Sequence, residues 1–314
     1  MNHQWNISNA EAGSRLDVFL ASQLPEMTRS AIAKRLKAGG GTVNGKPASV
    51  HRFLKAGDEV EFEPNISGRP TSAYVPSLEL AKSRTSDVRL IAETPDWLVI
   101  DKPTGLLVHP NAVNKTGTLI DWLLEHDQKI AKIGEDPERP GIIHRLDKEV
   151  SGLMVIAKTQ TAFDHLKHQF AEHTTEKRYL ALVHGEVIKD EGDIKFRIAR
   201  SKTKARMAAR PEHEEEGRAA WTHYKVIKRF RGATLLELNI FSGRTHQIRA
   251  HLLALGHPVV GDPLYALRSP NRKLKSPRLL LQAIALSFTD PATSERKTFD
   301  LPTDPAFAEV EKEL

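Results

Sequence analysis

The chain has 314 residues, 39% of them hydrophobic, so it can form one large or two ordinary domains with a buried core. Its formal net charge of +6 points weakly towards a polyanionic partner, and the absence of cysteine excludes disulfides, thiolate catalysis and cysteine-bound metals. The N-terminus is polar and no apolar run is long enough to span a membrane, so we expect a cytoplasmic protein.

Residues 13–63 are predicted to form a small basic module. Ser14–Asp17 opens a first helix, and Thr28 can cap a second helix that buries Ile32 and Leu36. The basic side chains of this second helix have no acid among them to form ion pairs, which leaves phosphate binding and a solvated basic face as equal alternatives. These residues are Arg29, Lys34, Arg35 and Lys37. Asn44-Gly45 then predicts a hairpin turn.

The rest of the chain is predicted to hold a proline-punctuated linker, one larger domain and a tail. The linker covers residues 64–87 and the tail residues 301–314, which is short and polar. Between them, residues 88–300 alternate strand and helix patterns typical of an α+β domain rich in antiparallel strands. A helix is predicted over residues 245–255, where Gly256 ends it.

One segment of this domain places a carboxylate between two apolar stretches. Residues 142–158 read IIHRLDKEVSGLMVIAK, with Asp147 after an Arg145-Leu146 pair and before a Ser-Gly turn. Ionised groups at the edge of a core seldom lack a partner or a task. From these residues alone, a strand-end salt bridge between Arg145 and Asp147 is the simpler interpretation.

A second segment, SGRTHQIRAH over residues 242–251, runs from a strand end through a glycine turn into a helix. His246 and Arg249 share one face of that helix, while Ile248 and Leu252 lie on the buried face. Arg249 can therefore be held rigidly at a helix start that points into a cleft. A surface arginine is the alternative for any single position of this kind.

These two segments, with Glu176-Lys177-Arg178-Tyr179 and residues 99–106, resemble the motifs of the RluA-type pseudouridine synthases. Residues 13–63 resemble an S-four-like RNA-binding domain, so the resemblance spans roughly residues 13–300. It implies an α+β fold in which a mainly antiparallel catalytic domain follows a small RNA-binding module. The implied activity isomerises uridine in structured RNA, in the cytoplasm, and needs no cofactor and no metal.

The resemblance also implies a role for individual residues. Asp147 corresponds to the single catalytic acid, and Arg249 to the arginine that pairs with it. Tyr179 corresponds to a tyrosine that stacks on the target base and moves a proton. Arg145, which helps to fill the gap left by the flipped base, Arg244 and His246 are expected to contact RNA, and Arg244 is a second choice for the pairing role.

The sequence departs from the family pattern at two places. Val150 stands where threonine is common, and Gln282 replaces a common histidine, a change expected to touch packing near the site. We expect a monomer that acts on large-subunit ribosomal RNA. A tRNA-directed enzyme and a non-catalytic RNA-binding protein are the alternatives.

Overall fold

A computed structural model describes the chain from residue 3 to residue 314, apart from residues 26, 38, 51, 65–84, 111–113, 202, 205, 267–273 and 275. The side chains of residues 29, 30, 34 and 37 also lie outside the description. The chain divides into two compact units, Met1–Val75 and Pro76–Leu314. Within the described ranges, no helix combines the length and apolarity needed to cross a bilayer.

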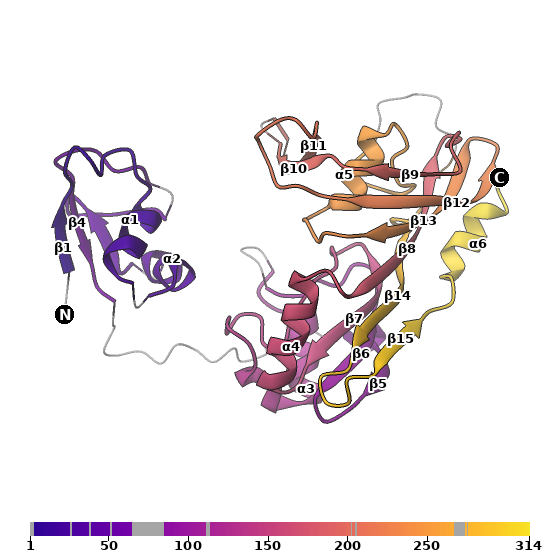
Figure 1. The fold of residues 1–314 in the computed structure, drawn as a ribbon, viewed down its shortest axis with the longest axis horizontal. Coiled ribbons are helices and arrows are strands. Elements are labelled where there is room, and N and C mark those ends of the chain that lie inside the picture. The colour runs from indigo at the N-terminus through magenta and orange to yellow at the C-terminus, as the bar shows by residue number, and fades with distance from the viewer. Residues whose placement is uncertain are drawn as a thin grey trace. The chain divides into compact units, whose positions relative to one another are not determined.

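The first unit packs two helices against a small antiparallel sheet of order β1-β4-β2-β3 (Figure 1). Its elements are β1 (His3–Asn6), α1 (Leu16–Gln23), α2 (Arg29–Lys37), β2 (Gly41–Val43), β3 (Lys46–Pro47) and β4 (Glu59–Phe62). The predicted helical spacing is confirmed, because Leu16, Leu20 and Ile32 are fully buried in one core. The unit starts before residue 13, since β1 pairs with β4 along its whole length.

Two local predictions in this unit are confirmed by the backbone. The Thr28 hydroxyl accepts a hydrogen bond from the Ala31 amide at 3.2 Å, as a helix cap should. Asn44 and Gly45 take φ values of 54° and 71°, which is the left-handed geometry of the tight turn that joins β2 to β3. The predicted linker, residues 64–87, lies outside the described residues from 65 to 84.

The second unit is built on one large sheet of order β5-β6-β7-β14-β8-β13-β12-β9, with β15 paired to β14 (Figure 1). Its strands are β5 (Arg89–Glu93), β6 (Trp97–Lys102), β7 (Ser151–Ala157), β8 (Glu176–His184), β9 (Glu191–Ile194), β12 (Thr222–Phe230), β13 (Ala233–Ile240), β14 (Leu281–Thr289) and β15 (Arg296–Asp300). A separate hairpin is formed by β10 (Arg197–Arg200) and β11 (Met207–Arg210). Among the strands that the structure describes, β7 and β14 are the one pair that runs parallel, so the predicted mainly antiparallel α+β fold is confirmed.

Helices pack against this sheet. They are α3 (Leu119–His126), α4 (Gln160–Ala171), α5 (Gln247–Ala254) and α6 (Pro305–Glu311), with 3-10 turns at Thr85–Asp87 and Gln128–Lys132. The largest core joins α5, through Ile248 and Leu252, to the central strands. The predicted stop of α5 is confirmed by Gly256, whose φ is +89°.

The chain after residue 300 is not the polar tail expected from sequence. It forms α6, whose Phe307 and Val310 are buried against Leu180 and Leu182 of β8. The segment is polar overall, but its two apolar side chains lie on one face of the short helix, and this face packs into the core. Gln282 fastens the approach to α6, because it donates to the Pro302 carbonyl at 3.1 Å and accepts from the Asp304 amide at 2.9 Å.

Candidate active site

Asp147 lies in the loop before β7, at an open pocket of about 530 Å³ that also borders Tyr179, Arg244 and Arg249. The glycine of the Ser-Gly pair that follows this loop is required sterically. Gly152 has a φ of +121°, and a Cβ there would lie 2.2 Å from the Ala283 carbonyl oxygen of β14. Only glycine lets β7 and β14 approach this closely, and their pairing fixes where the Asp147 loop begins.

Lys102, at the end of β6, is hydrogen-bonded to the same loop. Its buried ammonium donates to the carbonyls of Pro103 and Leu106 at 2.9 Å and to that of Lys148 at 3.2 Å. Burial lowers the pKa of Lys102 to about 7, and the charge of Asp147 opposes this shift most strongly. The three carbonyls match the three N–H groups of a charged lysine. Lys102 therefore ties the wall at residues 103–106 to the residue next to Asp147.

A glutamine fixes the turn that starts α5. The Gln247 side-chain oxygen accepts from the Ser242 hydroxyl at 2.8 Å and from the Arg244 amide at 3.1 Å. Its amide group donates to the Trp221 carbonyl and the Thr222 hydroxyl, both at 3.0 Å. Because these four bonds lock the turn, the side chains of the first helical turn are held in place.

Arg249 lies between two carboxylates in this buried corner. Its Nε and Nη2 donate to the two oxygens of Asp262 at 2.7 and 2.8 Å, and its Nη1 donates to Asp147 Oδ2 at 3.3 Å. The guanidinium and the Asp262 carboxylate are 1% and 0% exposed. Burial alone lowers the pKa of Arg249, but the two carboxylates outweigh it and raise that pKa above its ordinary value. Arg249 is therefore a permanent cation beside Asp147.

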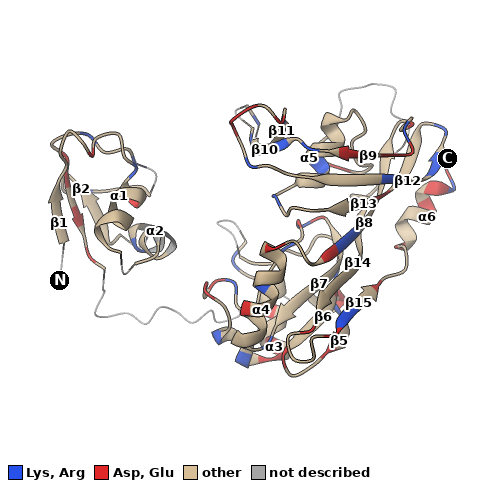
Figure 2. Ribbon diagram, viewed as in Figure 1, with Lys and Arg blue, Asp and Glu red and all other residues tan. Residues whose placement is uncertain are grey.

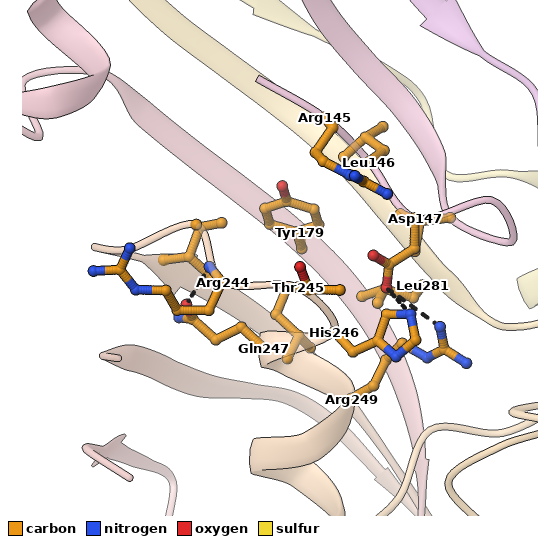
Figure 3. Close-up of a pocket in the computed structure, with 14 residues that line it drawn as sticks. Arg145, Leu146, Asp147, Tyr179, Arg244, Thr245, His246, Gln247, Arg249 and Leu281 are labelled. Carbon is orange, nitrogen blue, oxygen red and sulfur yellow. Dashed lines mark hydrogen bonds and ion pairs between the residues drawn. The ribbon is translucent and has the colours of Figure 1, made fainter. Parts of the chain in front are cut away.

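The Asp147 carboxylate is held from one side (Figure 3). Arg249 and His246 both approach Oδ2, His246 with its Nε2 at 3.9 Å. Within the described ranges, the hydrogen bond and ion pairs of Asp147 all involve Oδ2, which leaves Oδ1 open to the pocket. An anchored oxygen beside an open one is the geometry that a carboxylate needs to react with a bound molecule.

Tyr179, on β8, forms an apolar wall of the pocket and is 6% exposed. Burial, with the nearby Asp147 charge, raises the pKa of Tyr179 well above its usual range, so the phenol keeps its proton. The ring is therefore suited to packing against a flat aromatic ligand. Its hydroxyl can donate or relay a proton, but it is not a standing base.

The structure places the other three predicted pocket residues differently. Arg145 is exposed at the rim, with its guanidinium 3.4 Å from the His109 ring. Arg244 points away from Asp147 (Figure 3), and its Nε donates to the Ala219 carbonyl at 3.2 Å. His246 lies close to Asp147, beside Arg249, with which it was predicted to share a helix face, and its contact with RNA stays a prediction. The geometry therefore gives the pairing position to Arg249 and leaves Arg145 and Arg244 facing solvent at the edges.

The basic residues of α2 are only partly described. The side chains of Arg29, Lys34 and Lys37 lie outside the described residues. Arg35 is buried, and its Nη2 donates to the Glu63 carboxylate at 3.2 Å. RNA binding by these residues stays a prediction, and for Arg35 it requires competition with Glu63. Basic and acidic residues alternate over both units (Figure 2), so bulk charge does not locate a binding face.

Sequence reasoning missed three residues that the site uses. Asp262 supplies the strongest partner of Arg249, Tyr265 packs beneath the same guanidinium, and Lys102 holds the Asp147 loop. The run GDPLY over residues 261–265 was visible, but nothing in its spacing assigns Asp262 to Arg249. Val150, one of the departures from the family pattern, is a buried residue of the pocket wall.

Comparisons with known proteins identify a family for each of the two units. The profile described as RNA pseudouridylate synthase matches residues 96–254, and that of the S4 domain matches residues 14–60. An Aquifex aeolicus protein named as an uncharacterized RNA pseudouridine synthase is 39% identical, over 94% of this chain and 92% of its own. Ribosomal large subunit pseudouridine synthase D of Neisseria meningitidis serogroup A is 36% identical, over 93% of this chain and 76% of its own.

A solved structure is also similar to this chain. Human RNA Pseudouridylate Synthase Domain Containing 1 superposes with a TM-score of 0.57 at 27% identity, over 70% of this chain and 85% of that one. Fold, pocket and comparisons together define an isomerase that acts on RNA and carries its own RNA-binding domain. The chain belongs to the RNA pseudouridylate synthase family.

Proposed function

We propose that this enzyme converts specific uridines of large-subunit ribosomal RNA to pseudouridine, with Asp147 as the reacting carboxylate. The observation that supports the proposal is the asymmetric environment of the Asp147 carboxylate. Its Oδ2 is anchored by Arg249, while Oδ1 is open to the pocket. Isomerisation breaks the bond from ribose C1′ to uracil N1, turns the base, and forms a bond from C1′ to C5. N1 keeps the electron pair of the broken bond and takes up a proton, while C5 loses its hydrogen as a proton, so atoms and electrons balance without a co-reactant.

Each pocket residue has a defined task in this reaction. Asp147 stabilises or captures the electron-poor intermediate through its open oxygen, as carboxylates do in glycoside chemistry. Arg249 keeps that carboxylate ionised in an apolar surrounding. Tyr179 packs against the detached uracil and relays the C5 proton outward. The uridine enters flipped out of its helix, which costs a few kcal/mol, and Arg145 at the rim is placed to fill the gap.

The proposed RNA target rests on the relatives. Three proteins named ribosomal large subunit pseudouridine synthase D are 34–36% identical to this chain over 93–95% of its length. Incubation of the enzyme with unmodified large-subunit rRNA and with unmodified tRNA transcripts separates the two targets. Conversion of uridine in tRNA alone would replace ribosomal RNA with the tRNA alternative.

The S4 domain is proposed to position the enzyme on RNA through phosphate contacts that read no sequence. Removal of residues 1–63 should weaken RNA binding, because those contacts release counterions. Each lost contact should lower the log–log salt slope of the affinity by about 0.7 to 0.9. Affinities measured at several salt concentrations check this, and an unchanged slope would show that the domain does not touch the RNA.

RNA that carries 5-fluorouridine at the target should stall on the enzyme or leave as a rearranged fluorinated base. Fluorine replaces the hydrogen that must depart from C5 as a proton, so the rearranged base cannot regain its aromatic ring. Gel shifts and nucleoside mass spectrometry detect both outcomes. Release of unaltered 5-fluorouridine, while uridine RNA is converted under the same conditions, would count against the proposed break and re-formation of the glycosidic bond.

A further inference from the structure

Tyr265 contacts both residues that approach Asp147 Oδ2, namely Arg249 and His246. Its ring is fully buried, and the Arg249 guanidinium lies over it at 5.0 Å from the ring centre. Its backbone amide donates to Asp262 Oδ1 at 3.0 Å, and Asp262 in turn holds Arg249. Its hydroxyl is 3.0 Å from His246 Nδ1. One side chain thus supports the arginine and the histidine together.

The hydrogen bonds of the Tyr265 hydroxyl determine where its proton points. The Met207 amide of β11 donates to that oxygen at 2.9 Å, and an amide cannot accept. The hydroxyl proton therefore has His246 Nδ1 as its partner among the described residues. Burial raises the pKa of Tyr265 to about 12, so the hydroxyl keeps this proton near neutral pH.

The same bond fixes the protonation of His246. Burial lowers the pKa of His246, which makes the neutral ring with a single N–H the dominant form. Since Nδ1 accepts from Tyr265, that single proton must lie on Nε2. Nε2 is the atom that faces Asp147 Oδ2, at 3.9 Å. Catalytic contacts of this length in a substrate-free enzyme commonly tighten when the substrate binds.

The backbone conformation of His246 indicates that the surrounding structure holds this residue in place. His246 has a φ of 54°, a left-handed conformation that non-glycine residues adopt only where the surroundings enforce it. The locked turn at Gln247 supplies that enforcement, and the result is a ring placed between Tyr265 and Asp147.

We propose that Tyr265 is a positioning residue of the isomerase, whose hydroxyl fixes His246 as the Nε2–H tautomer and so gives Asp147 Oδ2 a second donor beside Arg249. With both donors on Oδ2, the carboxylate cannot rotate without losing them, and Oδ1 stays directed at the ribose carbon. The proposal deepens the function proposed above and rests on it for the identity of the reaction.

The ring nitrogens of histidine report the tautomer directly. Full-length protein labelled with ¹⁵N at its histidine rings is studied by NMR without RNA, and the His246→Asn variant identifies the His246 signals by their loss. We expect a protonated Nε2 and an unprotonated, accepting Nδ1 at His246. A proton on Nδ1 in the wild-type protein would overturn the proposal.

Tyr265→Phe keeps the ring and removes only the hydroxyl. The His246 tautomer should then lose its fixed form, and turnover on large-subunit rRNA should fall about tenfold, the effect of losing the hydrogen bond from His246 to the charged Asp147 carboxylate. The RNA affinity should not change, because the hydroxyl touches no solvent-facing surface. Unchanged turnover, or an unchanged tautomer in this variant, would contradict the positioning role.

Tyr224→Phe is the matched control, since Tyr224 is another buried tyrosine of the same unit and does not line the pocket. It should leave both the His246 signals and turnover unchanged, and an equal loss in this variant would reduce the Tyr265 effect to general destabilisation. The tautomer is read in the free protein. Wild-type enzyme that shows the Nε2–H form but converts no uridine would therefore overturn the proposed function and not the tautomer assignment.

Discussion

Asp147→Asn is expected to lower uridine isomerisation on the order of 10⁴-fold or more, the size of loss that follows removal of one member of a catalytic triad. The amide has nearly the same shape, but it has no negative charge to offer the ribose carbon through the open oxygen. RNA affinity and melting temperature should stay close to wild type, because the side chain is at the pocket surface and 14% exposed. Single-turnover assays on rRNA transcript and a thermal melt measure these quantities.

The same substitution at Asp164 is the control for this result, since Asp164 is an exposed residue of α4. It should retain full activity. A purified Asp147→Asn protein that still converts uridine at nearly the wild-type rate would show that another group is the reacting carboxylate.

Arg249→Ala should have the second largest effect, and a much larger one than Arg244→Ala. Removal of Arg249 leaves the Asp262 carboxylate buried without a cation, which typically costs about 3–5 kcal/mol of stability. It also takes from Asp147 the charge that anchors Oδ2. Arg244 faces away from Asp147, and its side chain donates to the Ala219 backbone carbonyl, so its loss should weaken RNA contacts at most.

A double variant separates stability from catalysis at Arg249. Arg249→Ala combined with Asp262→Ala leaves no uncompensated buried charge, so it should regain part of the lost stability but none of the activity. Chemical denaturation and turnover are measured on both proteins. A larger activity loss in Arg244→Ala than in Arg249→Ala would mean that the roles of the two arginines are exchanged.

The sequence predicted those features that depend on local pattern. The paired strands around Asp96, the helix ended by Gly256 and the turn at Asn44-Gly45 all follow from hydrophobic period and turn chemistry, and the structure confirms them. The proximity of Asp147 and Arg249 followed from resemblance to a family, and the hydrogen bond between them agrees with it.

Features that depend on distant parts of the chain could not be predicted in this way. β1 lies far from β4 in sequence, so only the sheet register reveals their pairing. The burial of the Arg35 side chain likewise depends on its hydrogen bond to Glu63, a residue far away in the sequence. Asp262 and Tyr265 act on residues in another element, and α6 is held by a core that no local pattern discloses.

The most direct test of the account is a map of new pseudouridines in unmodified large-subunit rRNA treated with the purified enzyme. Sequencing after chemical derivatisation of pseudouridine locates each converted uridine. We predict conversion at a small set of defined uridines by the wild-type protein, and none by Asp147→Asn at equal RNA occupancy. Binding of the RNA by the wild-type protein with no new pseudouridine, or the same sites with Asp147→Asn, would contradict the account.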